Sequence, residues 1–341
     1  MKFQQFKRRE MIALLAGAAV WRREFIKFMG ATASLPFSAR AQEPGRVYRI
    51  AFLLLTSRES PSVVALLDEL RFNGFVEGQN LIVIPGGFGV QNDQIASVAQ
   101  SVVAASPDVI RAGPELPLRA LQKITQTIPL VGMSEDMVAT GLAASLARPG
   151  GNITGLSLLS PELDGKRQEI LMEACPGLRK LAILADSNVT PPAHVEQLRQ
   201  AAQSHGTEAL VRGVAKREEV ISVIEEVKAS GAQAINFLAT PMFSVDPADF
   251  IAQLTKLRLA SIYQWPEDAD GGALLGYGPR FTEMYRQTAR IVVKVLRGTK
   301  PAEIPVEQPT TFELVINLKT AKAIGVDVPT SLLLRADKII E

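Results

Sequence analysis

The chain has 341 residues and a formal net charge of +2, and 47% of its residues are hydrophobic against 21% that are charged. A chain of this length exceeds the usual size of one hydrophobic core, so we expect two globular lobes. Lys and Arg form no cluster after residue 41, which argues against nucleic acid as a partner.

The first 41 residues carry the excess of positive charge. They hold 8 of the 37 basic residues and 2 of the 35 acidic ones, which leaves 29 basic against 33 acidic residues and a net charge of −4 in residues 42–341. Arginine pairs at residues 8–9 and 22–23 each precede an apolar stretch, a pattern typical of twin-arginine export signals.

Residues 39–41 read Ala-Arg-Ala, which provides the two small side chains that a signal peptidase needs. We predict a signal peptide over residues 1–41 that is cleaved after Ala41. An uncleaved membrane anchor is the alternative, but the apolar runs are shorter than the roughly 20 residues that span a bilayer.

From residue 49 onward, short apolar runs alternate with amphipathic stretches, and this alternation is typical of βα units. The first set predicts strands followed by helices at residues 50–55 and 63–72, 81–84 and 95–105, 109–112 and 118–124, and 130–133 and 138–146. Runs that are apolar on both faces indicate a parallel sheet covered by helices on both sides, which right-handed crossovers make doubly wound.

After a helical stretch at residues 164–174 the alternation restarts and predicts a second lobe of the same α/β class. Its predicted strands and helices lie at residues 181–185 and 195–204, 208–211 and 220–229, 234–238 and 250–257, and 261–263, with a further apolar run at 273–275.

The last part predicts a long amphipathic helix at 281–296, a proline-punctuated crossing, a strand at 312–317 and a short helix at 320–324. We therefore predict lobe 1 from residues 47–155 and 278–300, and lobe 2 from residues 156–277 and 301–341. Two such lobes place strand ends on both sides of a cleft, where open α/β sheets bind ligands.

Four phrases in order along the chain carry a family resemblance. They are residues 74–80 (GFVEGQN), 144–155 (ASLARPGGNITG), 277–279 (YGP) and 305–322 (PVEQPTTFELVINLKTAK). The chain resembles the ABC-transporter substrate-binding family related to tryptophan/tyrosine-type importers, over nearly all of residues 42–341. The resemblance implies the type I periplasmic binding protein fold, a periplasmic location, a small-molecule ligand and a membrane permease as partner.

The sequence departs from the family pattern at the ends of the predicted strands. The family usually has Gly-Thr-Pro, Asp-Pro, Asn-Pro-Asn, Asp-Pro-Phe and Ser-Tyr-Gly-Pro where this chain has residues 113–115 (GPE), 136–137 (DM), 186–188 (DSN), 240–242 (TPM) and 276–279 (GYGP). Because a ligand should bind at these positions, the family's amino-acid specificity is not transferred outright.

Polar and aromatic residues after the strands are the predicted ligand contacts. Hydroxyl groups suit a carboxylate, acids suit an ammonium group, and aromatic faces suit a flat or apolar body. The candidates are the hydroxyl residues Ser57, Ser134 and Thr240, the acids Glu115, Asp136 and Asp186, the amide Asn188, the aromatics Tyr263, Trp265 and Tyr277, and the adjoining Gly278.

Each candidate also has a plain structural explanation. Ser57 and Ser134 suit helix N-caps, Asp186 and Asn188 suit turns, and Tyr263 and Trp265 suit the core. Tyr277 is the strongest candidate because it follows a predicted strand, lies between two glycines and precedes the helix that returns to lobe 1.

The sequence shows no pattern for a cofactor site, a metal site or a nucleophile. No phosphate loop, dinucleotide-binding glycine run or nucleophile elbow is visible, so we expect no cofactor. We also expect no metal site, because His194 and His205 are not at helical ligand spacing and should lie on helix surfaces. Cys175, the only cysteine, suits packing better than nucleophilic chemistry.

The leading interpretation is an exported solute-binding component of an ABC-type importer, which is not an enzyme. It should bind an amino acid or a related small polar or aromatic solute by lobe closure, as a monomer. Two alternatives stay open: a sensory partner of a membrane receptor, and an exported enzyme that would use Asp136 opposite Asp186 as acid and base.

Overall fold

A computed structural model describes residues 45–158, 160–244 and 246–341. Residues 45–341 form a compact unit of their own. The predicted signal peptide at residues 1–41, with its cleavage after Ala41, lies outside the described residues. Within the described part, no helix is both long and apolar enough to cross a membrane.

The first lobe is built on a parallel sheet of five strands in the order β2-β1-β3-β4-β5. Its strands are β1 (Tyr48–Leu54), β2 (Leu81–Val83), β3 (Val109–Gly113), β4 (Leu130–Ser134) and β5 (Ile153–Ser157). The helices of this lobe are α2 (Pro61–Phe72), α3 (Ile95–Ala104), α4 (Glu115–Ile124) and α11 (Phe281–Leu296), with a 3-10 turn at Asn92–Gln94.

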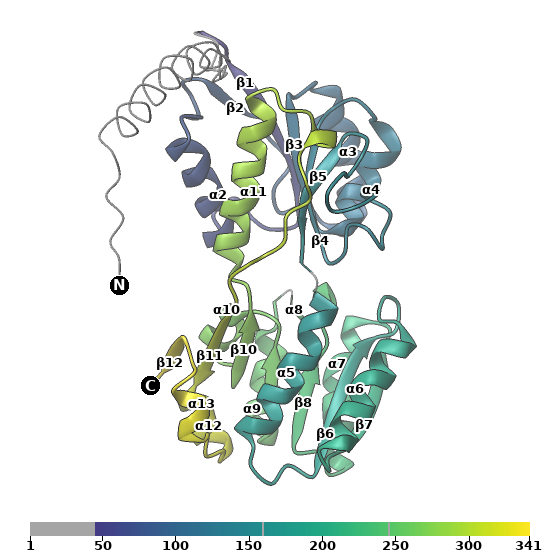
Figure 1. Cartoon of the computed structure of the whole chain (residues 1–341), viewed down its shortest axis with the longest axis vertical. Helices are drawn as coiled ribbons and strands as arrows, with labels where there is room; N and C mark the ends of the chain where they lie inside the picture. Colours follow the sequence, from purple (N-terminus) through teal and green to yellow (C-terminus); the bar gives the residue numbers. More distant parts are fainter. Residues whose placement is uncertain (1–44, 159, 245) are drawn as a thin grey trace, which may run out of the picture. The chain divides into compact units, whose positions relative to one another are not determined.

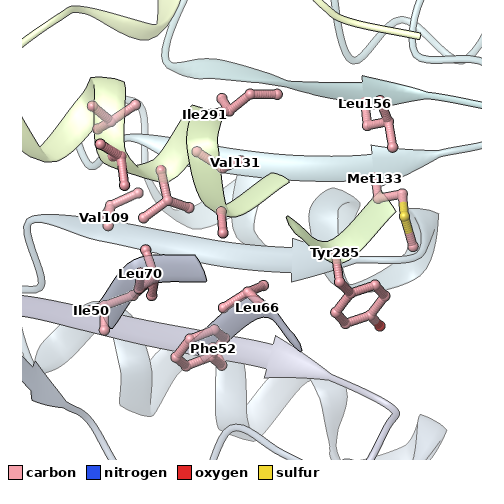
Figure 2. Close-up of a cluster of buried hydrophobic side chains, with 14 of the residues drawn as sticks. Ile50, Phe52, Leu66, Leu70, Val109, Val131, Met133, Leu156, Tyr285 and Ile291 are labelled. Carbon is pink, nitrogen blue, oxygen red and sulfur yellow. The ribbon is translucent and has the colours of Figure 1, made fainter. Parts of the chain in front are cut away.

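Helices cover both faces of this sheet. Figure 1 shows α2 and α11 side by side on one face, and Figure 2 shows the buried side chains that they share with the strands. The other face packs against α3 and α4. Alternate residues of β1 divide between the two cores, with Phe52 facing α2 and α11 and Leu53 facing α3 and α4, as the pleat of a strand requires.

The second lobe is built on a sheet of seven strands in the order β12-β11-β10-β9-β8-β6-β7. Its strands are β6 (Lys180–Asp186), β7 (Glu208–Val214), β8 (Ala234–Phe237), β9 (Ala260–Tyr263), β10 (Leu275–Gly278), β11 (Glu313–Asn317) and β12 (Lys338–Ile340). Strands β6 to β10 are parallel, while β11 pairs antiparallel with β10 and parallel with β12.

The helices of the second lobe also cover both faces of its sheet. They are α5 (Ser160–Ala174), α6 (Pro192–Ser204), α7 (Val220–Ala229), α8 (Pro241–Ser244), α9 (Ala248–Leu257), α10 (Pro266–Asp270), α12 (Leu318–Ile324) and α13 (Thr330–Leu333), with 3-10 turns at Arg217–Glu219 and Pro301–Glu303. One core packs under α5, α12 and α13, and the other under α7 and α9. The predicted class, two doubly wound α/β lobes, is confirmed.

One predicted helix is wrong. Residues 138–146 form turns and bends instead of a helix. The side chain of Asp136 accepts hydrogen bonds from the backbone N–H groups of Val138 and Ala139, and Gly141 has a φ of +70°, which a right-handed helix does not allow. The apolar residues in this segment pack on the first sheet without helical periodicity.

Residues 301–307 return to the first sheet, although the predicted boundary assigns them to lobe 2. The Thr154 hydroxyl on β5 donates to the Ile304 carbonyl at 2.8 Å, and the backbone N–H of Ser157 donates to the Glu307 carbonyl at 2.9 Å. Val306 is buried in the core under α3 and α4. We propose that the chain crosses to the second lobe after Glu307 and not at Pro301.

Candidate functional site

Two predicted contacts follow β1 and β3 of the first sheet. Ser57 is exposed, and its carbonyl accepts a hydrogen bond from the hydroxyl of Ser60, the residue that caps α2. Glu115 is half-buried in the first turn of α4 and forms an ion pair with Arg119 at 2.9 Å. Both residues lie at the carboxyl edge of the sheet, but Glu115 already has a cationic partner.

The end of β4 carries Ser134 and Asp136, which differ in what their side chains do. Ser134 is 2% exposed, and its hydroxyl has no hydrogen-bond partner among the described residues. Asp136 accepts hydrogen bonds at 2.9 Å from the backbone N–H groups of Val138 and Ala139. Ser134 therefore has a buried hydroxyl available to a ligand, whereas Asp136 caps a turn.

In the second lobe, the Asp186 carboxylate accepts hydrogen bonds from both Asn188 and Thr240. Asp186 Oδ1 accepts from the Asn188 backbone and side-chain nitrogens, and its Oδ2 accepts from the Thr240 hydroxyl at 3.0 Å. Asn188 also donates to the carbonyl of Ala215. The structure thus brings these three predicted residues together as a polar cluster that joins the ends of β6 and β8.

The aromatic candidates Tyr263, the last residue of β9, and Trp265, which follows it, are buried. The Tyr263 ring stacks on Phe237, with centroids 4.6 Å apart and planes 16° apart, so it is part of the core. Burial, followed by the charge of Asp268, raises the pKa of the Tyr263 hydroxyl well above its usual value. The Trp265 ring packs against the Phe281 ring, with centroids 4.2 Å apart. The indole N–H of Trp265 has no hydrogen-bond partner among the described residues.

Tyr277 and Gly278 lie at the end of β10, directly before α11. The Tyr277 side chain is half-buried, its ring centroid lies 6.4 Å from that of Phe312, and its carbonyl accepts a hydrogen bond from Arg167 Nε at 2.9 Å. A Cβ at Gly278 would lie 2.1 Å from the carbonyl oxygen of Gln264. Gly278 is therefore needed for backbone packing, and only Tyr277 of the pair offers a side chain.

The Asp136 and Asp186 carboxylates were the acid and base pair required by the enzyme alternative. Asp136 accepts two backbone hydrogen bonds in its turn, and Asp186 accepts from Asn188 and Thr240. Both carboxylates therefore have local structural partners, and the partner Asn188 gives Asp186 the turn role that the sequence left open.

Sequence reasoning missed a buried arginine in the first sheet. Arg111, the middle residue of β3, is 0% exposed, and burial lowers the pKa of its guanidinium while Tyr285 opposes that effect. The available signal was a basic residue inside a run predicted to be a strand covered on both faces, where apolar side chains are expected.

A second missed arginine is the centre of a charged network in the second lobe. Arg167 on α5 donates to Asp164 at 2.6 Å, and Asp164 in turn lies 3.0 Å from His194 Nε2. Burial lowers the pKa of the Arg167 guanidinium, while the charges of Asp164 and Glu135 raise it. His194, predicted on a helix surface, is instead partly buried in this network, whereas His205 is exposed as predicted.

Two acids on α10 form a third missed feature. Burial raises the pKa of Glu267, and it raises that of Asp268 well above the usual value, with the Glu267 charge adding to the shift of Asp268. Glu267 accepts a hydrogen bond from the backbone N–H of Phe281, the first residue of α11, at 2.9 Å. Glu267 therefore supports the start of α11.

A cavity in the second lobe lies away from these residues. Its volume is about 510 Å³, and it is lined by Cys175, Pro176, Leu178, Lys228, Gln233, Arg258, Ala260, Gly325, Val326 and Asp327. It adjoins the amino ends of β8 and β9, opposite the edge where open α/β sheets bind ligands. Burial raises the pKa of the Cys175 thiol to about 12, so this thiol is a packing group rather than a nucleophile.

The comparisons with known proteins agree on one family. The family model described as ABC transporter substrate binding protein matches residues 65–340. A tyrosine-binding protein of Clostridioides difficile is 25% identical over 264 residues, which cover 76% of this chain and 74% of that protein.

Solved structures support the same fold. A conserved domain protein from Vibrio cholerae is 25% identical with a TM-score of 0.76, covering 86% of this chain and 100% of that chain. An ABC domain from Streptococcus pneumoniae in complex with L-Trp is 21% identical with a TM-score of 0.74, at the same coverage. The open, ligand-free form of a substrate-binding protein from Clostridium difficile is 21% identical with a TM-score of 0.65, covering 86% of this chain and 99% of that chain. These likenesses show the type I periplasmic binding protein fold.

Proposed function

Because the chain belongs to the ABC transporter substrate-binding protein family, we propose that it captures a small amino-acid-like solute outside the cytoplasm and delivers it to an importer permease. The observation that carries this proposal is the family match over residues 65–340, together with a curated relative that is a tyrosine-binding protein.

The polar atoms at the strand ends support a ligand of this kind. The Ser134 hydroxyl and the Trp265 indole N–H are buried and have no hydrogen-bond partner among the described residues. Buried polar groups normally have partners, because an unmade hydrogen bond in the protein interior costs about 1–3 kcal/mol. A bound solute with a carboxylate or hydroxyl group would supply the missing acceptors.

Capture by such a protein requires binding but no covalent chemistry. A ligand that contacts both lobes favours the conformation in which those contacts are made together, and the permease would recognise that conformation. The predicted contacts come from both lobes, with Ser134 in the first and Thr240 and Tyr277 in the second. We propose that these residues share the ligand.

A thermal-shift screen of residues 42–341 tests the proposal. The panel contains amino acids, aromatic acids, small carboxylates and nucleosides. A ligand that binds only the folded state stabilises it by about 2.7 kcal/mol at a hundredfold excess over its dissociation constant. We expect one chemical class, the aromatic amino acids, to give a saturable rise in the midpoint.

Variants at the proposed site complete the test. Ser134→Ala and Tyr277→Ala should weaken the response to the ligand, whereas Ser222→Ala, at an exposed position on α7, should leave it unchanged. No shift from any class would contradict the proposal. Turnover of a panel compound by the chain would favour the exported enzyme instead.

A further inference from the structure

Arg111 lies in apolar surroundings between the first sheet and α11. Its guanidinium carbon is 4.5 Å from the centroid of the Tyr285 ring, and its Nη2 is 3.9 Å from the sulfur of Met133. Figure 2 shows Met133 and Tyr285 close to each other near the carboxyl ends of the strands. The same buried cluster includes Trp265 of the second lobe. The cationic head is therefore held by a ring face and a thioether.

Apart from the Tyr285 side chain, the guanidinium lacks the partners that a buried cation needs. Its Nε and Nη1 atoms have no hydrogen-bond partner, and no carboxylate forms an ion pair with it among the described residues. Arginine keeps its charge even when buried, so loss of a proton cannot relieve the cost of desolvation. An uncompensated buried charge is strongly unfavourable, and a bound anion would compensate it.

The Arg111 guanidinium lies toward the edge of the first sheet at which the strands have their carboxyl ends. Arg111 Nη1 lies 3.0 Å from the place that a Cβ of Gly113 would occupy, and Gly113 is the last residue of β3. The side chain thus runs along its strand to the carboxyl end, where open α/β sheets bind their ligands. The absence of a side chain at Gly113 leaves room for the guanidinium itself at this edge.

We propose that Arg111 binds the carboxylate of the transported solute, with the adjacent Nη1–H and Nη2–H groups as donors. The planar fork of an arginine matches a carboxylate, and such charge-assisted hydrogen bonds are the strong ones. Tyr285, Met133 and Trp265 would contact the rest of the molecule. The solute class is therefore a carboxylic acid with an apolar or aromatic body, and this inference rests on the proposed function.

Matched ligands test the chemistry by isothermal titration of residues 42–341, a segment that contains the whole compact unit. L-Tryptophan, indole-3-propionate and tryptamine share one ring system and differ in the carboxylate and the amine. We expect L-tryptophan and indole-3-propionate to bind, and tryptamine to bind at least 100-fold more weakly than L-tryptophan. Equal binding of tryptamine would overturn the role of Arg111 while leaving the proposed function intact. Failure of all three and of L-tyrosine, while another compound of the thermal-shift panel binds, would overturn the inferred solute class and leave the proposed function intact. Failure of the whole panel would overturn both.

Variants separate binding from a structural role. Arg111→Met should lower the affinity for L-tryptophan at least 100-fold without lowering the unfolding midpoint of the unliganded protein, because an apolar side chain of similar length replaces a buried, uncompensated charge. Arg111→Lys should retain part of the affinity. Arg71→Met, whose side chain is 68% exposed and pairs with Asp68, is the control and should bind as the unsubstituted chain does. Unchanged affinity in Arg111→Met would overturn the inference, and so would a lowered affinity that comes with a lowered midpoint of the unliganded protein.

Discussion

Arg167 and Lys166 are neighbours on α5, and their ion pairs differ in how deeply they are buried. The Arg167–Asp164 pair is buried, with side-chain exposures of 0% and 3%, whereas the Lys166–Glu169 pair is 45% and 57% exposed. Arg167→Met would leave Asp164 buried with less compensation, so we expect a loss of about 3 kcal/mol in the free energy of unfolding. Lys166→Met should cost less than about 1 kcal/mol. Urea unfolding of both variants measures the difference, and equal losses would contradict it.

Asp268 should make the stability depend on pH. Burial raises the pKa of this carboxyl in the folded state well above 3.8, so the unfolded chain loses the proton first as the pH rises. Stability therefore falls between pH 3.8 and the folded-state pKa and stays reduced above it. Asp268→Asn should raise the midpoint at pH 8, by roughly 2–4 °C for each kcal/mol gained, with a smaller gain at pH 5.

The control for this titration is Asp249→Asn at an exposed position on α9. Thermal unfolding of both variants at several pH values gives the comparison. A gain in Asp268→Asn that does not shrink on acidification would show that the carboxyl is ionised in the folded protein at low pH.

At the residue scale, the sequence located residues whose positions follow from local periodicity. The sequence located Ser134 and Tyr277 at strand ends, because a strand end can be read from periodicity. It missed Arg111, Arg167 and Asp268, because their importance comes from burial and from partners distant along the chain. Arg167, for example, donates to a carbonyl 110 residues away.

At the scale of the elements, glycine substitutions should separate close packing from helix propensity. A Cβ at Gly278 would meet the backbone oxygen of Gln264 at 2.1 Å, so Gly278→Ala should displace the β10–α11 connection and destabilise the protein. Gly165 lies inside α5, and the atom nearest to a Cβ added there would be a methyl carbon of Leu198, 3.9 Å away. Gly165→Ala should therefore stabilise by up to about 1 kcal/mol. Thermal unfolding checks both, and a stable Gly278→Ala would contradict the packing argument.

Strongly periodic elements were predicted best. The predicted helices at 220–229 and 281–296 have the bounds that the structure gives α7 and α11. The failure at 138–146 came from local hydrogen bonding by Asp136, which competes with a helix in a stretch of suitable hydrophobicity.

At the scale of the whole molecule, the proposed capture predicts a change of shape. A ligand shared by both lobes should reduce the radius of gyration of residues 42–341 in small-angle X-ray scattering. Arg111→Met at the same ligand concentration should show no reduction, because its sites would be mostly empty. An unchanged radius in the unsubstituted chain at saturating ligand would contradict closure.

The sequence by itself determined the class of fold and the family, because βα alternation and long family phrases are local along the chain. The tertiary structure decided where the chain returns to the first sheet and which charges are buried. Residues 304–307 pack on β5 through contacts about 150 residues apart, and Arg111 meets Tyr285 across a similar separation. Burial and electrostatic pairing depend on distances in space between such segments, and the order of residues alone does not fix those distances.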